Sequence, residues 1–218
     1  MKIAVLWDLD GTLLDSLEDL KDAVNYTLRH YGLPERTLDE VRRFVGNGAE
    51  ELIRLSLPGK PGDPARSEAL AYYQVYYREH SGIKTRPYDG VLQALTEVGR
   101  KYPMAVVSNK PDAATKLLCA NLFPGVYALG ESPACPRKPA PDMVRKAMAE
   151  LGADGCVYVG DSEVDVLTAK NAGVPCLSVL WGFRDRQTLE AAGARYFCEE
   201  TASLPAIIER IIEETYGT

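Results

Sequence analysis

The sequence has little histidine and no paired cysteines. Only two of its 218 residues are histidine, His30 and His80, and neither lies near any of the five cysteines in the sequence. The cysteine count is odd and no two cysteines form a C-x-x-C pair, which argues against a zinc site and against a disulfide framework. Reduced thiols in an intracellular protein are therefore expected.

Long apolar segments and basic runs are also missing. The apolar run at residues 3–7 is too short for a signal-peptide core, and the longest apolar-rich stretch, residues 174–183, is too short to span a bilayer. Acidic residues outnumber basic ones by 31 to 25, giving a net charge of −6, so the chain is a poor candidate for binding nucleic acid or an anionic membrane. We expect a soluble cytoplasmic monomer or homodimer, and a phosphorylated partner would require local cations or a metal.

The remaining composition is that of a globular protein. Apolar residues make up 46% and charged residues 26%, and the length suits one domain, or one domain with a sizeable insertion. Apolar runs that predict buried parallel strands occur at residues 3–7, 104–107, 126–129, 156–159, 174–179 and 195–198. Helical patterns between them are clearest at residues 88–98, 111–121, 141–151 and 163–172. This alternation predicts an α/β fold, a Rossmann-like parallel sheet with helices on both faces.

Residues 16–83 interrupt the alternation, because no strand is predicted there. Apolar side chains fall on one face of a predicted helix that starts at Leu17, and two short helices are predicted at residues 38–44 and 49–57. A loop rich in proline and glycine precedes Asp63, which we expect to cap a helix beginning at Pro64. The sequence thus predicts a core of residues 1–15 and 84–218, with an all-helical domain of residues 16–83 inserted after the first strand.

The strongest local signal is Asp8-Leu9-Asp10-Gly11-Thr12, directly after the first predicted strand. Carboxylates two residues apart on an extended segment point the same way, and the carboxyl ends of strands are where open α/β sheets bind ligands. Gly11 lets the backbone turn sharply and approach a ligand closely. The alternative is an acidic turn that merely ends a strand, but a chance match to this pattern is expected in roughly one such chain in a thousand. The segment therefore favours a catalytic site.

Three further motifs follow in order. Ser108 comes after the predicted strand at residues 104–107, Lys138 lies in a proline-rich loop, and Asp161 and Asp165 follow the predicted strand at residues 156–159. With the first motif, they resemble the four motifs of the haloacid dehalogenase superfamily of phosphotransferases, and the resemblance extends to about residue 183. The helical insertion resembles the cap domain of the branch that contains phosphoglycolate phosphatase and β-phosphoglucomutase.

The resemblance implies a Mg²⁺-dependent phosphatase in which Asp8 is the nucleophile and forms an aspartyl-phosphate. It implies that the Asp8 carboxylate, the Asp10 backbone carbonyl and Asp161 bind Mg²⁺, with Asp165 in direct contact or one step removed. Asp10 would protonate the leaving alkoxide and later activate water, so it must hold a proton near neutral pH. Taken alone, Asp165 would instead suit the first turn of the predicted helix at residues 163–172.

The same resemblance assigns residues to the substrate. Lys138 would supply a fixed positive charge to the nucleophile and the phosphoryl group; its alternative is a solvated loop lysine. The Ser108 hydroxyl and the Asn109 backbone N–H would donate to a phosphate oxygen, although Ser108 could instead cap a helix. We expect Gly11 and Thr12 to bind the substrate as well.

The substrate itself is less constrained by the motifs. The turn around Asn47 resembles a segment of bacterial phosphoglycolate phosphatases and could offer backbone N–H groups to a carboxylate, or it could be a plain turn. Lys110 is a candidate to bind a carboxylate of the substrate, or it could be an ordinary surface charge. We expect the substrate to be 2-phosphoglycolate. The alternative functions on the same scaffold are those of a phosphomutase, a pyrophosphatase or a nucleotide monophosphatase. A non-catalytic binding protein with this fold is disfavoured because Asp8, Asp10, Lys138 and Asp161 are all present.

Overall fold

The structure is a computed structural model that describes residues 1–59, 62 and 64–217. The chain divides into two compact units, of which the first comprises Met1–Leu14 with Pro87–Thr218 and the second Asp15–Arg86. The sequence placed the corresponding boundaries at residues 15 and 84. Across the described part of the chain, none of the helices has the length and apolar character needed to cross a membrane.

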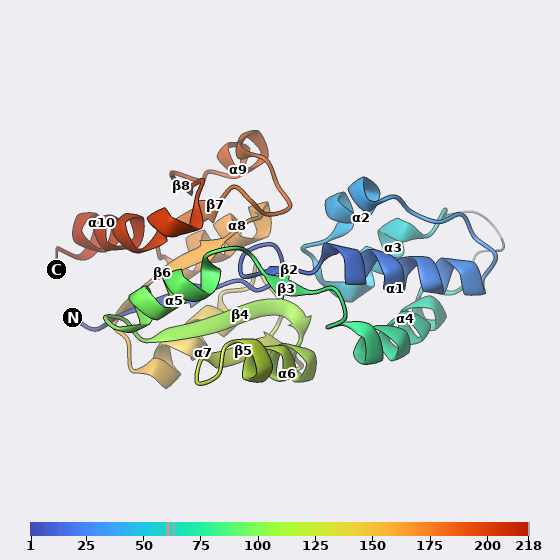
Figure 1. The fold of residues 1–218 in the computed structure, drawn as a ribbon, viewed down its shortest axis with the longest axis horizontal. Helices are drawn as coiled ribbons and strands as arrows, with labels where there is room; N and C mark the ends of the chain where they lie inside the picture. The colour runs from blue at the N-terminus through green and yellow to red at the C-terminus, as the bar shows by residue number, and fades with distance from the viewer. Residues whose placement is uncertain (60–61, 63, 218) are drawn as a thin grey trace. The chain divides into compact units, whose positions relative to one another are not determined.

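The first unit contains one six-stranded parallel sheet. Its strands are β1 (Ile3–Trp7), β4 (Met104–Pro111), β5 (Tyr127–Glu131), β6 (Gly155–Gly160), β7 (Cys176–Val179) and β8 (Tyr196–Cys198), in the spatial order β5-β4-β1-β6-β7-β8. The central strand β1 pairs with β4 on one side and β6 on the other. Figure 1 shows these strands running side by side within this unit.

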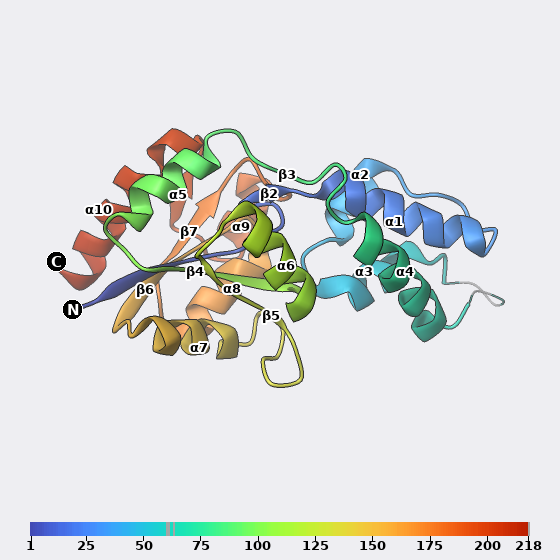
Figure 2. The same ribbon diagram turned by 60° about the horizontal axis from the view of Figure 1, so that its bottom comes forward.

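Helices cover both faces of the sheet because side chains alternate along each buried strand. Ile3, Val5 and Trp7 pack on one face against the helices α5 (Val91–Gly99), α6 (Asp112–Leu122) and α10 (Leu204–Tyr216). Ala4 and Leu6 pack on the other face against α7 (Asp142–Leu151) and α8 (Glu163–Ala172). Two short elements, α9 (Arg186–Ala191) and a 3₁₀ turn (Thr201–Ser203), complete this unit. The predicted Rossmann-like α/β sheet, with helices on both of its faces, is confirmed (Figure 2).

Some element boundaries differ from the prediction. Helix α5 begins at Val91, three residues later than expected, because Gly90 has a φ of 79°, outside the right-handed helical region. Strand β4 continues through Ser108 to Pro111, so Ser108 lies within the strand and does not cap α6. The C-terminal helix α10 was not predicted.

The second unit is helical. It contains α1 (Leu17–His30), α2 (Leu38–Phe44), α3 (Gly48–Ser56) and α4 (Arg66–His80), and α4 packs on both α1 and α3. Helix α4 begins two residues after the predicted start at Pro64, because Ala65 keeps an extended ψ of 138°; its predicted cap, Asp63, lies outside the described residues. The short strands β2 (Leu14–Asp15) and β3 (Arg86–Pro87) pair where the chain passes between the units.

A buried carboxylate on α1 fixes the segment that leaves the second unit. Asp19 accepts the backbone N–H groups of Lys84 and Thr85, at 3.0 and 2.8 Å, through Oδ2. The Thr85 hydroxyl donates to the same oxygen at 2.7 Å. Because Asp19 is only 5% exposed, these bonds are protected from water and tie the returning chain to α1.

Candidate active site

Asp8 and Lys138 form a buried ion pair at the carboxyl end of β1. The backbone N–H of Asp8 donates to the Val159 carbonyl at 2.8 Å, which continues the pairing of β1 with β6. The Asp8 Oδ1 atom lies 2.7 Å from the Lys138 ammonium, and the two side chains are 10% and 2% exposed. The alternative of a solvated loop lysine is therefore wrong for Lys138.

The Lys138 loop is held from two directions. The Asn109 side chain accepts the backbone N–H of Lys138 at 2.6 Å and donates to its carbonyl at 3.1 Å. The Lys138 ammonium donates to Asp165 Oδ1 at 2.7 Å and to the Tyr158 hydroxyl at 3.0 Å. Tyr158 also lies 3.1 Å from the Val107 carbonyl and so connects Lys138 to β4. The ammonium thus has a single, well-defined position beside Asp8.

Asp161 follows β6 and lies against Gly11, Gly182 and the backbone of Phe183. Its Oδ2 accepts the backbone N–H of Phe183 at 2.7 Å, and its Oδ1 lies 3.2 Å from the Thr12 hydroxyl. A Cβ atom on Gly11 or Gly182 would come within 2.3 Å of Asp161 side-chain atoms, so only glycine permits this approach. Thr12 thereby supports Asp161, while its carbonyl accepts the Trp181 indole N–H at 3.0 Å.

Asp165 occupies the first turn of α8 and has partners on both of its oxygens. Its Oδ2 accepts the backbone N–H groups of Asp161 and Ser162 at 3.2 and 3.0 Å, and the Ser162 hydroxyl at 2.6 Å. Its Oδ1 accepts Lys138, with the Tyr158 hydroxyl 3.3 Å away. Asp165 therefore lies in the first turn of the helix, as its alternative predicted, where it forms a capping box with Ser162, and it also anchors Lys138 beside Asp8.

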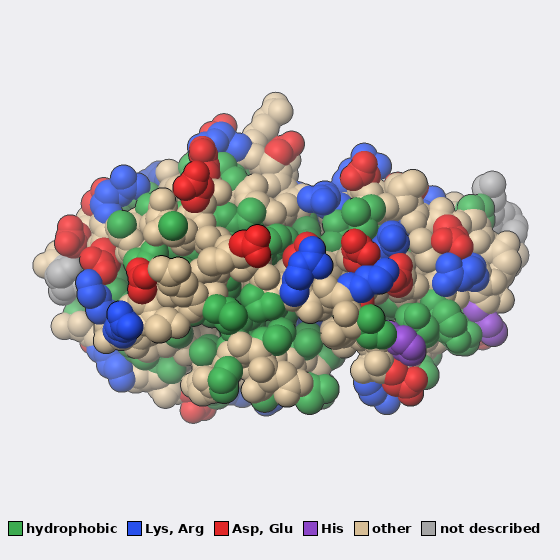
Figure 3. All heavy atoms as spheres, in the orientation of Figure 1, with side chains coloured by type: hydrophobic (Ala, Val, Ile, Leu, Met, Phe, Trp, Pro, Cys, Tyr) green, Lys and Arg blue, Asp and Glu red, His purple; other side chains and the backbone are tan. Residues whose placement is uncertain are grey.

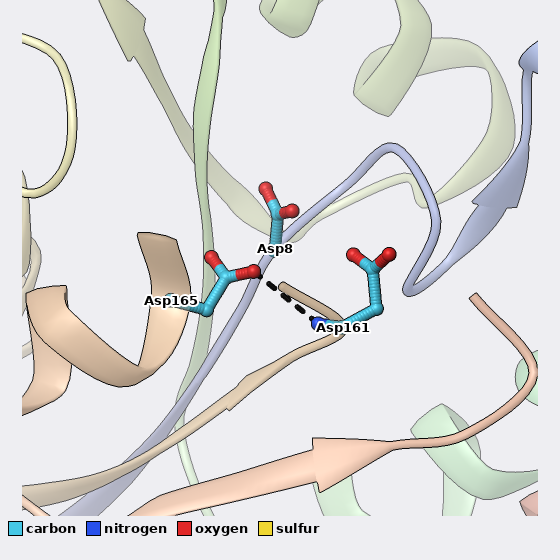
Figure 4. Close-up of side chains that lie close together, drawn as sticks. All are labelled: Asp8, Asp161 and Asp165. Atoms are coloured by element: carbon cyan, nitrogen blue, oxygen red, sulfur yellow. Dashed lines mark hydrogen bonds between the residues drawn. The ribbon is translucent and has the colours of Figure 1, made fainter. Parts of the chain in front are cut away.

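Asp8, Asp161 and Asp165 form the one group, among the residues that the structure describes, in which three carboxylates could hold a metal ion. Each offers an oxygen, and the three oxygens lie within 4.8 Å of one another. Figure 4 shows the three side chains near one another, Asp8 from the end of β1, Asp161 from the turn after β6 and Asp165 from the first turn of α8. All three are buried, and buried oxygen donors of this kind suit Mg²⁺.

The electrostatics of the group indicate an unbalanced negative charge. Burial raises the pKa of Asp8 well above its ordinary value, and Asp165 and Asp161 raise it further against the opposing effect of Lys138. Burial and Asp165 raise the pKa of Asp161 to about 7. Burial alone would lower the pKa of Lys138, but Asp165 and Asp8 outweigh it and raise that pKa, so the ammonium stays charged. One ammonium among three carboxylates leaves charge for a divalent cation to balance.

Asp10 and Lys110 form another ion pair in the same unit. The Lys110 ammonium lies 3.0 Å from Asp10 Oδ2, and the Lys110 side chain is 3% exposed, so the alternative of a surface charge is wrong. The Ser108 hydroxyl is buried and accepts the backbone N–H of Lys110 at 3.2 Å. Asn47, by contrast, belongs to the second unit, where it precedes α3.

Sequence reasoning missed several contributors to this site. Tyr158 looks like an ordinary member of a buried strand, and its only signal is a hydroxyl two residues before Gly160 in an otherwise aliphatic run. The backbone N–H of Phe183 and the indole of Trp181 act from the segment after β7. A backbone donor leaves no trace in residue type, so only the structure could show it.

Comparison with known proteins shows the family to which the chain is similar. Residues 5–179 match the family model for haloacid dehalogenase-like hydrolases. A phosphoglycolate phosphatase of Rhodobacter capsulatus is 35% identical over 217 residues, covering 96% of this chain and 98% of that protein. One of Xanthomonas campestris pv. campestris is 36% identical over 190 residues, covering 83% of this chain and 84% of that protein.

Solved structures give the same picture of the fold. A crystal structure from Lactobacillus delbrueckii subsp. bulgaricus, provisionally described as a phosphoglycolate phosphatase, superposes with a TM-score of 0.86 at 33% identity. The match covers 95% of this chain and 99% of that one. A structure from Haemophilus somnus has a TM-score of 0.84 at 24% identity, over 94% of this chain and 96% of that one, and shares the fold.

Proposed function

We propose a specific reaction for this chain, which belongs to the haloacid dehalogenase-like hydrolases and is a phosphoric monoester hydrolase. The proposed substrate is a small phosphate monoester, 2-phosphoglycolate. Hydrolysis would require Mg²⁺ and proceed through an aspartyl-phosphate on Asp8. The observation that carries the proposal is the buried Asp8 carboxylate, held 2.7 Å from Lys138 and grouped with Asp161 and Asp165. The curated relatives named as phosphoglycolate phosphatases support the choice of substrate.

In the first step an Asp8 oxygen attacks phosphorus and the bond to the substrate's ester oxygen breaks. The leaving oxygen takes a proton from the Asp10 carboxyl, which releases an alcohol and leaves Asp10 ionised. In the second step water attacks the phosphorus of the aspartyl-phosphate and gives its proton to Asp10. The Asp8–phosphorus bond then breaks, inorganic phosphate leaves, and both aspartates return to their starting states.

Lys138 and Ser108 act on charge and position. The Lys138 ammonium cannot accept a proton, and it balances the negative charge that Asp8 and the phosphoryl group bring together. Ser108 and the Asn109 backbone N–H would bind a phosphoryl oxygen. The Asn109 side chain contributes separately, because its two hydrogen bonds fix the Lys138 backbone.

The residues present fit a Mg²⁺ ion. The Asp8 and Asp161 carboxylates, with the Asp10 backbone carbonyl, would hold it, and Asp165 would support them because its oxygens already accept Lys138, Ser162 and backbone N–H groups. When bound, Mg²⁺ would neutralise part of the repulsion between a phosphate dianion and the attacking carboxylate. Asp161 is oriented for this role by Thr12 and Phe183.

The helical unit Asp15–Arg86 would serve as the cap domain. A cap excludes water and adds contacts to the part of the substrate that is not transferred. The backbone N–H groups around Asn47, at the start of α3, would then receive the carboxylate of 2-phosphoglycolate.

Phosphate release tests this function directly. We would measure release with Mg²⁺ and with a chelator, from 2-phosphoglycolate, hexose phosphates, nucleotide monophosphates and pyrophosphate, with Asp8→Asn as the blank. We expect Mg²⁺-dependent release that is fastest with 2-phosphoglycolate and absent from the blank. Faster release from another of these compounds would overturn 2-phosphoglycolate as the substrate but leave the proposed reaction in place. Little release from all of them would contradict the proposal that the protein is a phosphatase.

A further inference from the structure

The two oxygens of the Asp10 carboxylate have different surroundings. Oδ2 lies 3.0 Å from the Lys110 ammonium. Oδ1 is shielded from solvent and, within residues 1–59, 62 and 64–217, has no hydrogen-bond partner. A buried carboxylate oxygen without a donor is unfavourable in a folded protein, so its presence calls for a functional explanation.

We propose that Lys110 is a positioning residue that holds Asp10 by Oδ2 and so makes Oδ1 the oxygen that gives and takes the proton. This inference rests on the proposed function, in which Asp10 is the general acid and base. It assigns Lys110 to the chemistry of the leaving group, not to recognition of a substrate carboxylate.

The donor inventory of lysine gives the physical reason. An ammonium carries three donors and no acceptor, so it can share a hydrogen bond with Oδ2 only by donating. When Asp10 is protonated, the proton must therefore reside on Oδ1. The leaving alkoxide takes that proton, and the attacking water returns one to the same oxygen, so the two steps use one atom in one position.

The backbone of Lys110 is fixed well enough to position another residue. Its N–H donates to the Ser108 hydroxyl at 3.2 Å, and its carbonyl accepts the Thr115 hydroxyl at 3.2 Å. The adjacent strand β5 approaches closely, since a Cβ on Gly130 would lie 2.5 Å from the Lys110 carbonyl oxygen. Lys110 therefore extends from a rigid strand end, which limits the positions that its ammonium can take.

The test compares Lys110→Met and Lys110→Arg with a matched control, Lys116→Met. Lys116 is 55% exposed and pairs with Asp112 at 2.7 Å on α6, so its loss removes an ion pair far less buried. For an alkyl phosphate we expect Lys110→Met to lower kcat by about 10- to 100-fold with KM changed less than about threefold. We expect Lys110→Arg to recover part of kcat and the control to match the wild type.

An aryl ester separates the two steps. p-Nitrophenolate leaves without a proton, so Lys110→Met should still form the phosphoenzyme from p-nitrophenyl phosphate. Because the second step needs a base at Oδ1, the phosphoenzyme should accumulate to a higher level than in the wild type, measured by acid quenching and intact-mass analysis. A purely structural role for Lys110 would not produce this accumulation.

A double-mutant cycle guards against a folding defect. The double variant with Asp10→Asn and Lys110→Met leaves no unpaired buried charge. Because Lys110 acts through Asp10, this double variant should be as active as Asp10→Asn alone, within about twofold. A further loss equal to that in the wild-type background would overturn the proposal. So would a rise in KM for 2-phosphoglycolate alone, with kcat unchanged for esters that lack a carboxylate.

The outcomes for Lys110 and for the function can be told apart. Turnover by the wild type that is absent from Asp8→Asn supports the phosphatase whatever Lys110 does. No turnover of any ester by the wild type would overturn the function and, with it, this role.

Discussion

Replacing Asp161 with asparagine removes one charge from the carboxylate group without removing its hydrogen bonds. The asparagine oxygen can accept the Phe183 N–H that Asp161 Oδ2 accepts at 2.7 Å. Its amide can donate to the Thr12 hydroxyl, which lies 3.2 Å from Oδ1 and can accept as well as donate. The substitution therefore isolates the electrostatic effect of a buried carboxylate.

The magnitude follows from the pKa of Asp161, which burial and Asp165 raise from 3.8 to about 7. In the metal-free protein the contribution of this group to stability is complete below the unfolded pKa near 4 and is lost as the pH rises to 7, because the unfolded chain ionises first. At about 1.4 kcal/mol for each pKa unit, the loss reaches about 4 kcal/mol. Because Asp161 is coupled electrostatically to neighbouring carboxylates, we expect about 2–4 kcal/mol.

Denaturant unfolding in a chelator at pH 4.5, 6 and 8 measures this effect. We expect metal-free Asp161→Asn to be more stable than the wild type by about 2–4 kcal/mol at pH 8, with the difference shrinking towards pH 4.5. Added Mg²⁺ should raise the stability of the wild type at pH 8 and leave the variant nearly unchanged. A variant that is less stable than the wild type at pH 8, or a difference independent of pH, would refute this reasoning.

Three further substitutions test the supports of the site and of the helical unit. Tyr158→Phe removes a hydroxyl 3.0 Å from Lys138, and we expect a stability loss of about 1–3 kcal/mol and a fall in kcat at unchanged KM, measured by unfolding and steady-state kinetics. Gly182→Ala would place a Cβ 2.3 Å from that of Asp161, and we expect weaker Mg²⁺ activation in a metal titration of activity. Asp19→Ala removes the acceptor for the backbone N–H groups of Lys84 and Thr85. We expect faster amide hydrogen exchange at these two residues, because the free energy of local opening falls by about 2 kcal/mol.

The parts of the fold that the sequence predicted are those with the clearest periodicity. The continuous apolar run of β1 and the helix at Glu163–Ala172 have the predicted limits, because nothing in the surrounding structure competes with the local pattern. Helix α10 was missed although Ile208, Ile211 and Ile212 have helical spacing and are buried in the core.

The site was predictable where motif residues end buried strands, and not where the contact comes from the backbone or from an unexpected burial. Asp8 and Asp161 follow β1 and β6, neighbours in the sheet, so their proximity follows from parallel pairing. The burial of Lys110 was not predictable, because a lysine is rarely buried unless it has a partner, and that partner, Asp10, is 100 residues away in the chain. The buried position of Lys138 has the same explanation.

Both histidines of the chain stack on tyrosines of the helical unit. Tyr26, Tyr72 and Tyr76 form a stack on α1 and α4, with ring centroids 5.4 and 3.9 Å apart. His30 stacks on Tyr72 at 4.0 Å and His80 on Tyr76 at 3.8 Å. Figure 3 shows the two histidines with hydrophobic side chains between them. The only two histidines of the chain are thus part of this aromatic stack and not of the group formed by Asp8, Asp161 and Asp165.

The central claim is that Asp8 carries the phosphoryl group, and trapping the phosphoenzyme tests it most directly. The wild type and Asp10→Asn would be quenched in acid during turnover of p-nitrophenyl phosphate with Mg²⁺, digested, and mapped by mass spectrometry. We predict one hydroxylamine-sensitive phosphoryl group on Asp8, more abundant in Asp10→Asn and absent from Asp8→Asn. Turnover with the phosphoryl group on another residue, or undiminished turnover by Asp8→Asn, would contradict the account.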